Sequence, residues 1–262
     1  MQRDTLRQVV TIIGLVATLI VNALANILPL NGLRSGDVTA QYPVLFVPAP
    51  YVFAIWGVIY SGLIAFAIFQ ALPSQRENPR LRRIGGLFAV ASLANCAWIF
   101  AWHYGNFPLS MLFMLILLGS LIGIYLRLGT GQTRVTPAET WAVRVPFSIY
   151  LGWITAATIA NASQLLYVLG WDGWGLAPVT WTIIMLAAAV VVAALVAVTR
   201  RDVAYLAVPV WALIGIALRQ TSTPAVSLAA WVATGIVAAL LIWSAVRPLR
   251  LPASAANSMP AA

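Results

Sequence analysis

The chain has 262 residues, of which 62% are hydrophobic and 8% are charged. A soluble domain carries about 25% charged residues, so this composition excludes an ordinary soluble protein and indicates lipid as the main solvent. All 15 basic residues are arginines. They cluster between apolar runs, where they act as topology signals rather than as a surface for nucleic acid. We therefore expect a lipid bilayer, and no nucleic acid, as a partner.

Eight apolar runs are long enough to cross a membrane, for which a helix needs about 20 residues. Backbone groups in lipid must pair within the span, and runs of this length favour helices over barrel strands. The first run is longer than the 7–15 residues of a signal-peptide core, so we interpret it as a retained span. The seventh is short and contains Pro209. The predicted spans are 9–30, 50–71, 85–102, 107–126, 145–168, 177–199, 203–218 and 225–246.

The distribution of arginines supports eight spans and sets their direction. Thirteen arginines fall on the same side as the N-terminus, and only Arg34 and Arg219 fall on the other. The positive-inside rule makes the arginine-rich side cytoplasmic. We therefore predict an integral protein of the bacterial cytoplasmic membrane with both termini in the cytoplasm. The acidic residues all fall in predicted loops or tails, which disfavours an ion-coupled pump.

The sequence offers no catalytic or metal-binding motif. It contains one histidine and one cysteine, too few for a His/Cys metal site, and it has no nucleotide-binding glycine loop. We therefore expect neither a metal nor an enzyme. His103 lies at the outer end of the third predicted span. It is interpreted either as an interfacial polar residue or as an axial ligand to haem iron, and both interpretations stay open.

Aromatic and amide side chains lie inside the predicted spans. The chain has 11 tryptophans, and Trp56, Trp98 and Trp153 fall within spans rather than at the membrane interface that tryptophan prefers. Aromatic walls with few polar groups suit a flat, apolar ligand. The amides in the spans either join helices, each contributing about 1 kcal/mol, or line a cavity; they are Asn22, Asn26, Asn95, Asn161 and Gln164.

Three segments resemble the tryptophan-rich sensory protein family, the bacterial relatives of the translocator protein or peripheral-type benzodiazepine receptor. Residues 48–60 read PAPYVFAIWGVIY, a proline-rich turn followed by spaced aromatic residues. Residues 95–98 read NCAW, and residues 150–153 read YLGW, with an asparagine at position 161. The order and spacing agree with the family over roughly residues 9–168, although Tyr51 stands where the family has its first tryptophan.

This resemblance implies a five-helix bundle with an apolar pocket near one membrane face, closed by the first loop. Family members bind porphyrins, haem and sterol-like molecules, and a porphyrin-degrading activity is debated. No cofactor is obligatory, and porphyrin or haem would be a bound ligand. Carried over by position, the ligand-binding residues are Tyr51, Phe53, Trp56, Tyr60, Asn95, Trp98, Tyr150, Trp153 and Asn161, with Phe46 and Pro48 as a lid.

We therefore expect an all-α integral membrane protein with a five-span ligand-binding core at 1–168, a three-span extension at 169–250 and a disordered tail at 251–262. The expected function is a membrane-embedded sensor or carrier for flat lipophilic molecules, with Arg34 as a candidate cation for an acidic ligand. A facilitative transporter, with the last three spans as its moving half, is one alternative. A structural or assembly subunit is the other, because small residues along the eighth span allow close helix packing, including in a homodimer.

Overall fold

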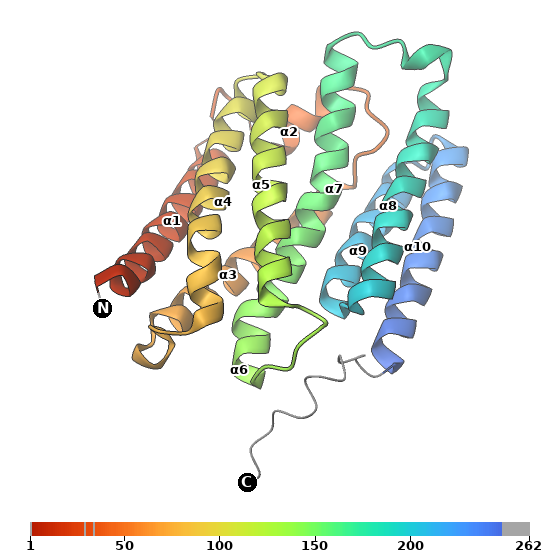
Figure 1. The fold of residues 1–262 in the computed structure, drawn as a ribbon. Coiled ribbons are helices and arrows are strands. Elements are labelled where there is room, and N and C mark those ends of the chain that lie inside the picture. The colour runs from red at the N-terminus through yellow and green to blue at the C-terminus, as the bar shows by residue number, and fades with distance from the viewer. Residues whose placement is uncertain (1, 29, 34, 248–262) are drawn as a thin grey trace.

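The computed structural model describes residues 2–28, 30–33 and 35–247, and all regular structure in this part of the chain is helical (Figure 1). Arg34 and the predicted tail 251–262 lie outside the described residues, as does the side chain of Asn26. The long helices are α1 Gln2–Ile27, α3 Ile55–Ala71, α4 Pro79–His103, α5 Phe107–Leu128, α7 Val145–Val168, α8 Pro178–Arg200, α9 Val203–Arg219 and α10 Pro224–Val246. The short elements are α2 Ser35–Ala40, η1 Pro50–Ala54, η2 Pro73–Gln75, α6 Pro137–Glu139, a π-helical turn η3 Thr140–Arg144, and η4 Gly173–Gly175.

Within the described residues, 7 helical segments are long and apolar enough to cross a membrane, with η1 and α3 counted as one. The remaining long helix, α9, has 17 residues. It extends about 25 Å at 1.5 Å per residue, which is less than a 30 Å hydrocarbon core. It corresponds to the seventh predicted span and continues through Pro209. α1 begins and α10 ends at the same end of the bundle (Figure 1), as an even number of passes requires.

A capped start explains why α4 begins six residues before its predicted span. The Asn78 side chain accepts a 2.9 Å hydrogen bond from the backbone N–H of Arg80, and Pro79 occupies the first turn. Asparagine at the cap and proline in the first turn both favour helix initiation. α4 therefore begins at Pro79, before the apolar run that predicted a start at residue 85. Asn106 caps α5 in the same way.

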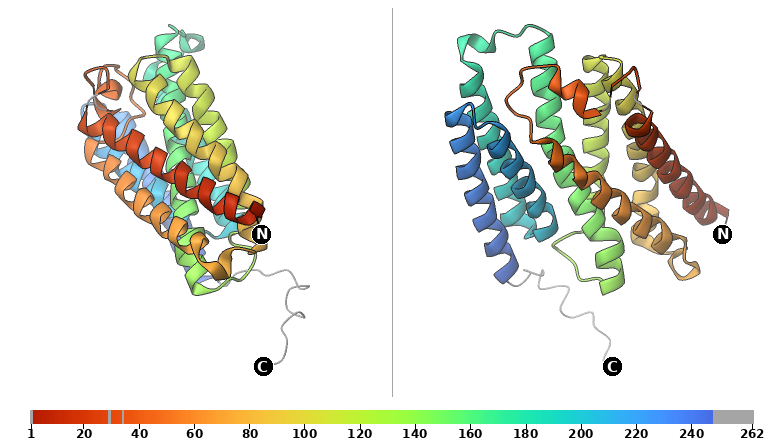
Figure 2. Two further views of the ribbon diagram at one scale, coloured as in Figure 1. Left: turned by 90° about the vertical axis from the view of Figure 1, so that its left-hand side faces the viewer. Right: turned by 180° about the vertical axis from the view of Figure 1, so that it is seen from behind.

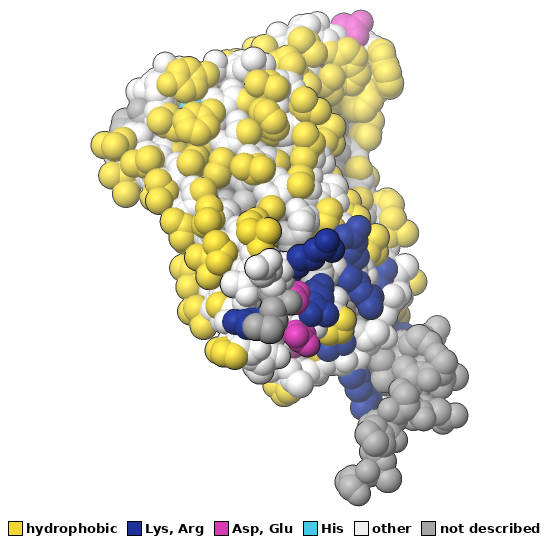
Figure 3. Space-filling model, turned by 60° about the vertical axis from the view of Figure 1, so that its left-hand side comes forward, with side chains coloured by type: hydrophobic (Ala, Val, Ile, Leu, Met, Phe, Trp, Pro, Cys, Tyr) yellow, Lys and Arg dark blue, Asp and Glu magenta, His cyan; other side chains and the backbone are white. Residues whose placement is uncertain are grey.

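Two acidic side chains pair with arginines at one end of the bundle, where Figure 3 shows a concentration of basic side chains. Asp4 accepts two hydrogen bonds of 2.7 Å from Arg82, and Glu139 accepts bonds of 2.6 and 3.0 Å from Arg80. Asp4 lies in α1 and Glu139 in α6, so the prediction that every acidic residue falls in a loop or tail is wrong. The helices extend beyond their apolar runs, and the acidic residues are in these extensions.

Three buried phenylalanines join the middle helices of the bundle. Phe66 of α3, Phe88 of α4 and Phe147 of α7 pack edge to face, with ring centroids 4.9 to 5.9 Å apart. Such pairs contribute about 0.5–1.5 kcal/mol beyond the area they bury. This cluster fixes α3 and α7 relative to each other on the arginine-rich side of the cavity described below.

The last three helices connect to the others mainly through α9. α9 packs against α7 and η1, whereas α10 packs against α8 and α9. The predicted division at residue 168 stays a prediction, but α9 contacts two elements that belong to the predicted core. The three added helices therefore reach the region in which the ligand-binding residues were expected.

Candidate functional site

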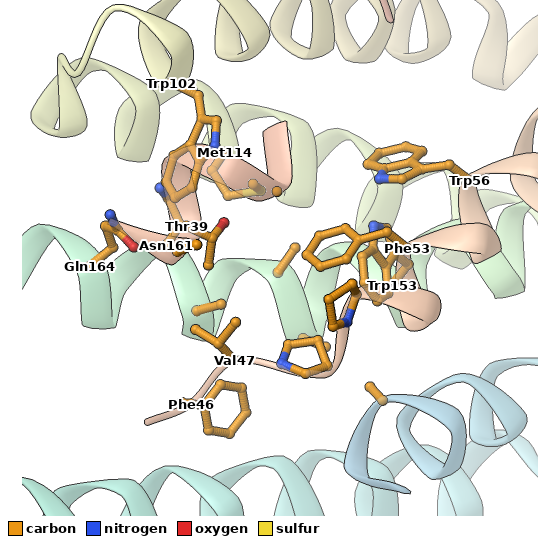
Figure 4. A pocket seen from close by; sticks show the side chains of 18 of the residues that line it. Thr39, Phe46, Val47, Phe53, Trp56, Trp102, Met114, Trp153, Asn161 and Gln164 are labelled. Carbon is orange, nitrogen blue, oxygen red and sulfur yellow. The ribbon is translucent and has the colours of Figure 1, made fainter. Parts of the chain in front are cut away.

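A cavity with a volume of about 570 Å³ lies among α1, α2, η1, α3, α4, α5, α7 and α9, with residues 46–50 along one side (Figure 4). Ligand pockets commonly have volumes of about 300–1,000 Å³ and are mostly apolar. Eight of the predicted site residues line this cavity: Phe46, Pro48, Phe53, Trp56, Tyr60, Trp98, Trp153 and Asn161.

One part of the cavity wall is an inner aromatic cluster, which we define as Phe53, Trp56, Tyr60 and Trp153. The Trp56 and Tyr60 rings are stacked, with centroids 5.3 Å apart. Trp153 meets Trp56 edge to face at 6.2 Å and Phe53 at 5.7 Å. These contacts hold one another's rotamers, so the cluster presents a wall that is already formed before a ligand binds.

The other part of the wall combines aromatic and polar side chains. Trp98 and Trp102 of α4 are stacked, with centroids 5.6 Å apart. Figure 4 shows Trp102 with Asn161 and Gln164 at one end of the cavity, and Phe53, Trp56 and Trp153 of the inner aromatic cluster at the other. The cavity is therefore amphipathic along its length.

Three nitrogen donors in the cavity lining are buried without a hydrogen-bond partner. They are the indole Nε1 atoms of Trp98 and Trp153 and the amide Nε2 of Gln164. A buried donor that stays unsatisfied costs about 1–3 kcal/mol. By contrast, the Asn161 side chain donates a 3.0 Å hydrogen bond to the Ser110 hydroxyl. The unpaired groups are all donors, so they would be matched by a ligand that carries hydrogen-bond acceptors.

The segment that closes the cavity on one side is the lid segment, residues 41–54, which enters the bundle before α3 begins (Figure 2). Irregular backbone at membrane depth is tolerated only where protein groups or water satisfy it. The Ala49 N–H donates a 3.0 Å hydrogen bond to the Gly215 carbonyl. The Trp211 indole N–H donates a 3.0 Å bond to the Val52 carbonyl. Both partners are in α9, so the seventh predicted span satisfies part of the lid backbone.

Gly215 allows the lid segment to approach α9 closely. A Cβ atom at this position would lie 2.2 Å from Val52 Cγ2, a separation that real Cβ atoms essentially never show. Beyond the end of α9, the Gln220 side chain donates a 2.8 Å hydrogen bond to the Leu45 carbonyl. The lid segment is thus held against the last three helices as well as against the predicted core.

Three predicted site residues lie outside the cavity lining. Asn95 accepts a 2.7 Å hydrogen bond from Asn22 and donates a 3.0 Å bond to the Tyr150 hydroxyl. Asn95 and Tyr150 therefore connect α1, α4 and α7 behind the cavity wall. Asn22 lines the cavity, whereas Asn95 does not. Tyr51 packs edge to face on Trp211, with centroids 5.2 Å apart.

The structure does not place His103 among the residues that line the cavity. Its side chain is 1% exposed, and its Nδ1 lies 2.7 Å from the Ile99 carbonyl oxygen. This position gives no support to the interpretation as a haem ligand. The predicted cation for an acidic ligand, Arg34, lies outside the described residues, whereas Arg219 lines the cavity.

Several lining residues were not predicted. Trp102 and Gln164 are within the region that resembles the family but outside its three motifs, and α9 follows that region. Gln164 could have been found from the sequence because it is an amide within a predicted span. Arg219 could have been found because it lies on the side of the membrane that has only two arginines. The lining side chains with aromatic, polar or charged groups that were not in the predicted ligand-binding set are Asn22, Asp37, Thr39, Trp102, Gln164 and Arg219. For Asn22 and Gln164, a position in a cavity lining was one of the two interpretations that the sequence left open.

An apolar helical bundle with an aromatic-walled cavity and a lid segment along one side fits the class of all-α membrane proteins. The family model described as TSPO-like protein matches residues 8–243, and the chain belongs to this family. The match runs through α8 and α9 and into α10, so it includes the helices beyond the five-span resemblance. Family membership suggests a membrane role in ligand binding or transport. Comparisons with curated proteins and with solved structures found no match.

Proposed function

We propose that this protein binds flat lipophilic molecules, such as porphyrins, haem or sterol-like compounds, and acts as a membrane-embedded sensor or carrier. The observation that carries this proposal is the 570 Å³ cavity whose walls include the inner aromatic cluster. Planar ring systems pack well on aromatic side chains in offset or edge-to-face arrangements. A cavity with one aromatic end and one more polar end would also orient such a ligand.

We further propose binding rather than catalysis as the primary activity. Within the described residues, no group of three or more His, Cys, Asp or Glu side chains could hold a metal ion. The side chains that line the cavity are mainly aromatic and aliphatic, with amides and one exposed acid, Asp37. These groups can position a ligand, whereas general acid–base chemistry requires a donor or acceptor poised at the reacting atom.

For the orientation in the membrane, we propose that the arginine-rich end of the bundle faces the cytoplasm. Figure 3 shows the basic side chains gathered at this end, which the positive-inside rule assigns to the cytoplasmic side. The cavity lies toward the opposite end, because Trp102 of α4 and Gln164 of α7 are near the ends of their helices. A ligand would then reach it from the outer face or from the outer half of the bilayer.

A titration of the purified chain with protoporphyrin and haem, followed by tryptophan fluorescence, tests this proposal. Wild type is compared with Trp153→Phe, in the cavity wall, and with Trp174→Phe, whose side chain is 76% exposed. We expect saturable quenching whose apparent affinity falls several-fold in Trp153→Phe and is unchanged in Trp174→Phe. Quenching that rises linearly with ligand and is identical in all three proteins would mean partitioning into the detergent, and would contradict the proposal.

A further inference from the structure

Arg219 occupies an unusual place at the end of α9. It lines the cavity while its side chain is exposed, so it lies where the cavity meets the surface. It also lies at the end of the bundle that is opposite to the arginine-rich end. Among the residues that the structure describes, none forms a hydrogen bond or an ion pair with its guanidinium.

The other charged residue in the described lining is Asp37 of α2, which does have an interaction partner within the protein. The guanidinium of Arg219 is therefore the charged group of the cavity mouth that remains available. A basic residue in the last turn of a helix also interacts favourably with the helix dipole. That effect accounts for an arginine at this position but not for its location in a cavity lining.

The interior of the cavity, like its mouth, offers hydrogen-bond donors rather than acceptors. The buried and unpartnered groups in the lining are the donors of Trp98, Trp153 and Gln164. Gln164 is 1% exposed, so its side chain must turn slightly toward the cavity for its amide to meet a ligand. A ligand that satisfies these groups must present acceptors, and an oxyanion is the strongest acceptor for a guanidinium.

We propose that the cavity takes an amphipathic monocarboxylate, whose flat apolar body lies along the aromatic walls and whose carboxylate pairs with Arg219 at the mouth. The inference rests on the proposed function and specifies its ligand class. A single guanidinium matches a single carboxylate rather than a polyanionic headgroup such as a phosphate dianion, and the other charged side chain of the described lining, Asp37, is an acid. An acceptor within the apolar body, such as a ring carbonyl, would be placed to meet Gln164.

Pyrenebutyrate and its methyl ester are a matched pair of probes for this test, since both accept energy from tryptophan and only one carries a charge. The full-length protein in a neutral detergent is titrated with each probe, as wild type, Arg219→Gln, Arg219→Lys and Arg134→Gln. Arg134 is an exposed arginine between α5 and α6 and serves as the control for loss of one positive charge. The ratio of acid to ester affinity within each protein removes the difference in partitioning between the probes.

We expect Arg219→Gln to weaken acid binding about fivefold, with the ester unchanged, as for loss of one strong, solvent-exposed ion pair. Arg219→Lys should retain most of the preference for the acid, and Arg134→Gln should match wild type. The same acid-to-ester ratio in Arg219→Gln and wild type would overturn this inference while leaving the proposed function intact. Absence of saturable binding of either probe to wild type would overturn both.

A second measurement needs no variant and decides the question if Arg219→Gln cannot be purified. Added salt screens an exposed ion pair, so acid binding to wild type should weaken as salt increases while ester binding stays constant. Equal responses of the two probes to salt would contradict a pairing between the carboxylate and Arg219.

Discussion

The indole N–H of Trp211 donates a 3.0 Å hydrogen bond to the backbone carbonyl of Val52, and so connects α9 to the lid segment. The two residues are 159 positions apart in the sequence. Their bond links the last group of helices to the chain that closes the cavity. Among the last three helices, α9 therefore takes part in forming the cavity rather than only extending the bundle.

Replacing Trp211 with phenylalanine should loosen the lid segment. The ring contact with Tyr51 can persist, but the Val52 carbonyl loses its indole donor and keeps only the bond from the Ile55 N–H. The expected cost is about 1 kcal/mol in unfolding free energy. Hydrogen exchange of the backbone amides in residues 43–54 should become faster. Trp231→Phe is the control, since Trp231 is exposed in α10. Unchanged exchange in Trp211→Phe would mean that other contacts alone hold the lid.

Gly215→Ala should disturb the packing of α9 against the lid segment. The added Cβ would lie 2.2 Å from Val52 Cγ2, so the lid must shift, at an expected cost of about 1–3 kcal/mol in unfolding free energy. The matched control is Gly235→Ala in α10, where a Cβ would have nothing within 4 Å. There the higher helix propensity of alanine should leave stability equal or slightly increased. Thermal unfolding in detergent compares the two, and equal melting temperatures would contradict the assigned lid contact.

Asn95→Ala should weaken the bundle behind the cavity wall. Asn95 bonds to both Asn22 and Tyr150, and hydrogen bonds between membrane helices average about 0.6 kcal/mol, with a maximum near 1.7. We expect a loss of about 1–2 kcal/mol in unfolding free energy, and less than additive losses when Asn95→Ala is combined with Tyr150→Phe. Strict additivity of the two changes would show that the bond between these side chains contributes nothing.

Much of the helical framework could be predicted from apolar runs. The fifth predicted span, 145–168, coincides with α7 Val145–Val168, and its end is set by the glycine-containing loop that follows. Its start is where the π-helical turn η3 becomes α-helical, and the helical segment as a whole begins at Pro137. The start of α4 could not be found in this way, since it depends on the Asn78 cap rather than on hydropathy. The short helix α2 was not predicted either, because it lies in a polar loop.

The candidate site was only partly predictable. Motifs in 48–60, 95–98 and 150–161 supplied seven predicted lining residues, and the predicted lid supplied Phe46, since the resemblance marks positions on the elements that surround the cavity. It did not distinguish residues that face the cavity from residues such as Asn95 that join helices behind it. The contribution of α9 depends on contacts between Gly215 and the lid segment. Such contacts between distant parts of the chain leave no local pattern in the sequence.

The most direct test of the account is to fill the cavity. Ala157 of α7 lines it, whereas Ala239 of α10 is exposed, so Ala157→Phe is compared with Ala239→Phe in equilibrium binding of protoporphyrin. The account predicts that Ala157→Phe stays folded and loses at least about tenfold in affinity, a difference of 1.4 kcal/mol, while Ala239→Phe binds like wild type. Equal affinity in both variants and in wild type would contradict it, since the ligand would then bind elsewhere or only partition into the detergent.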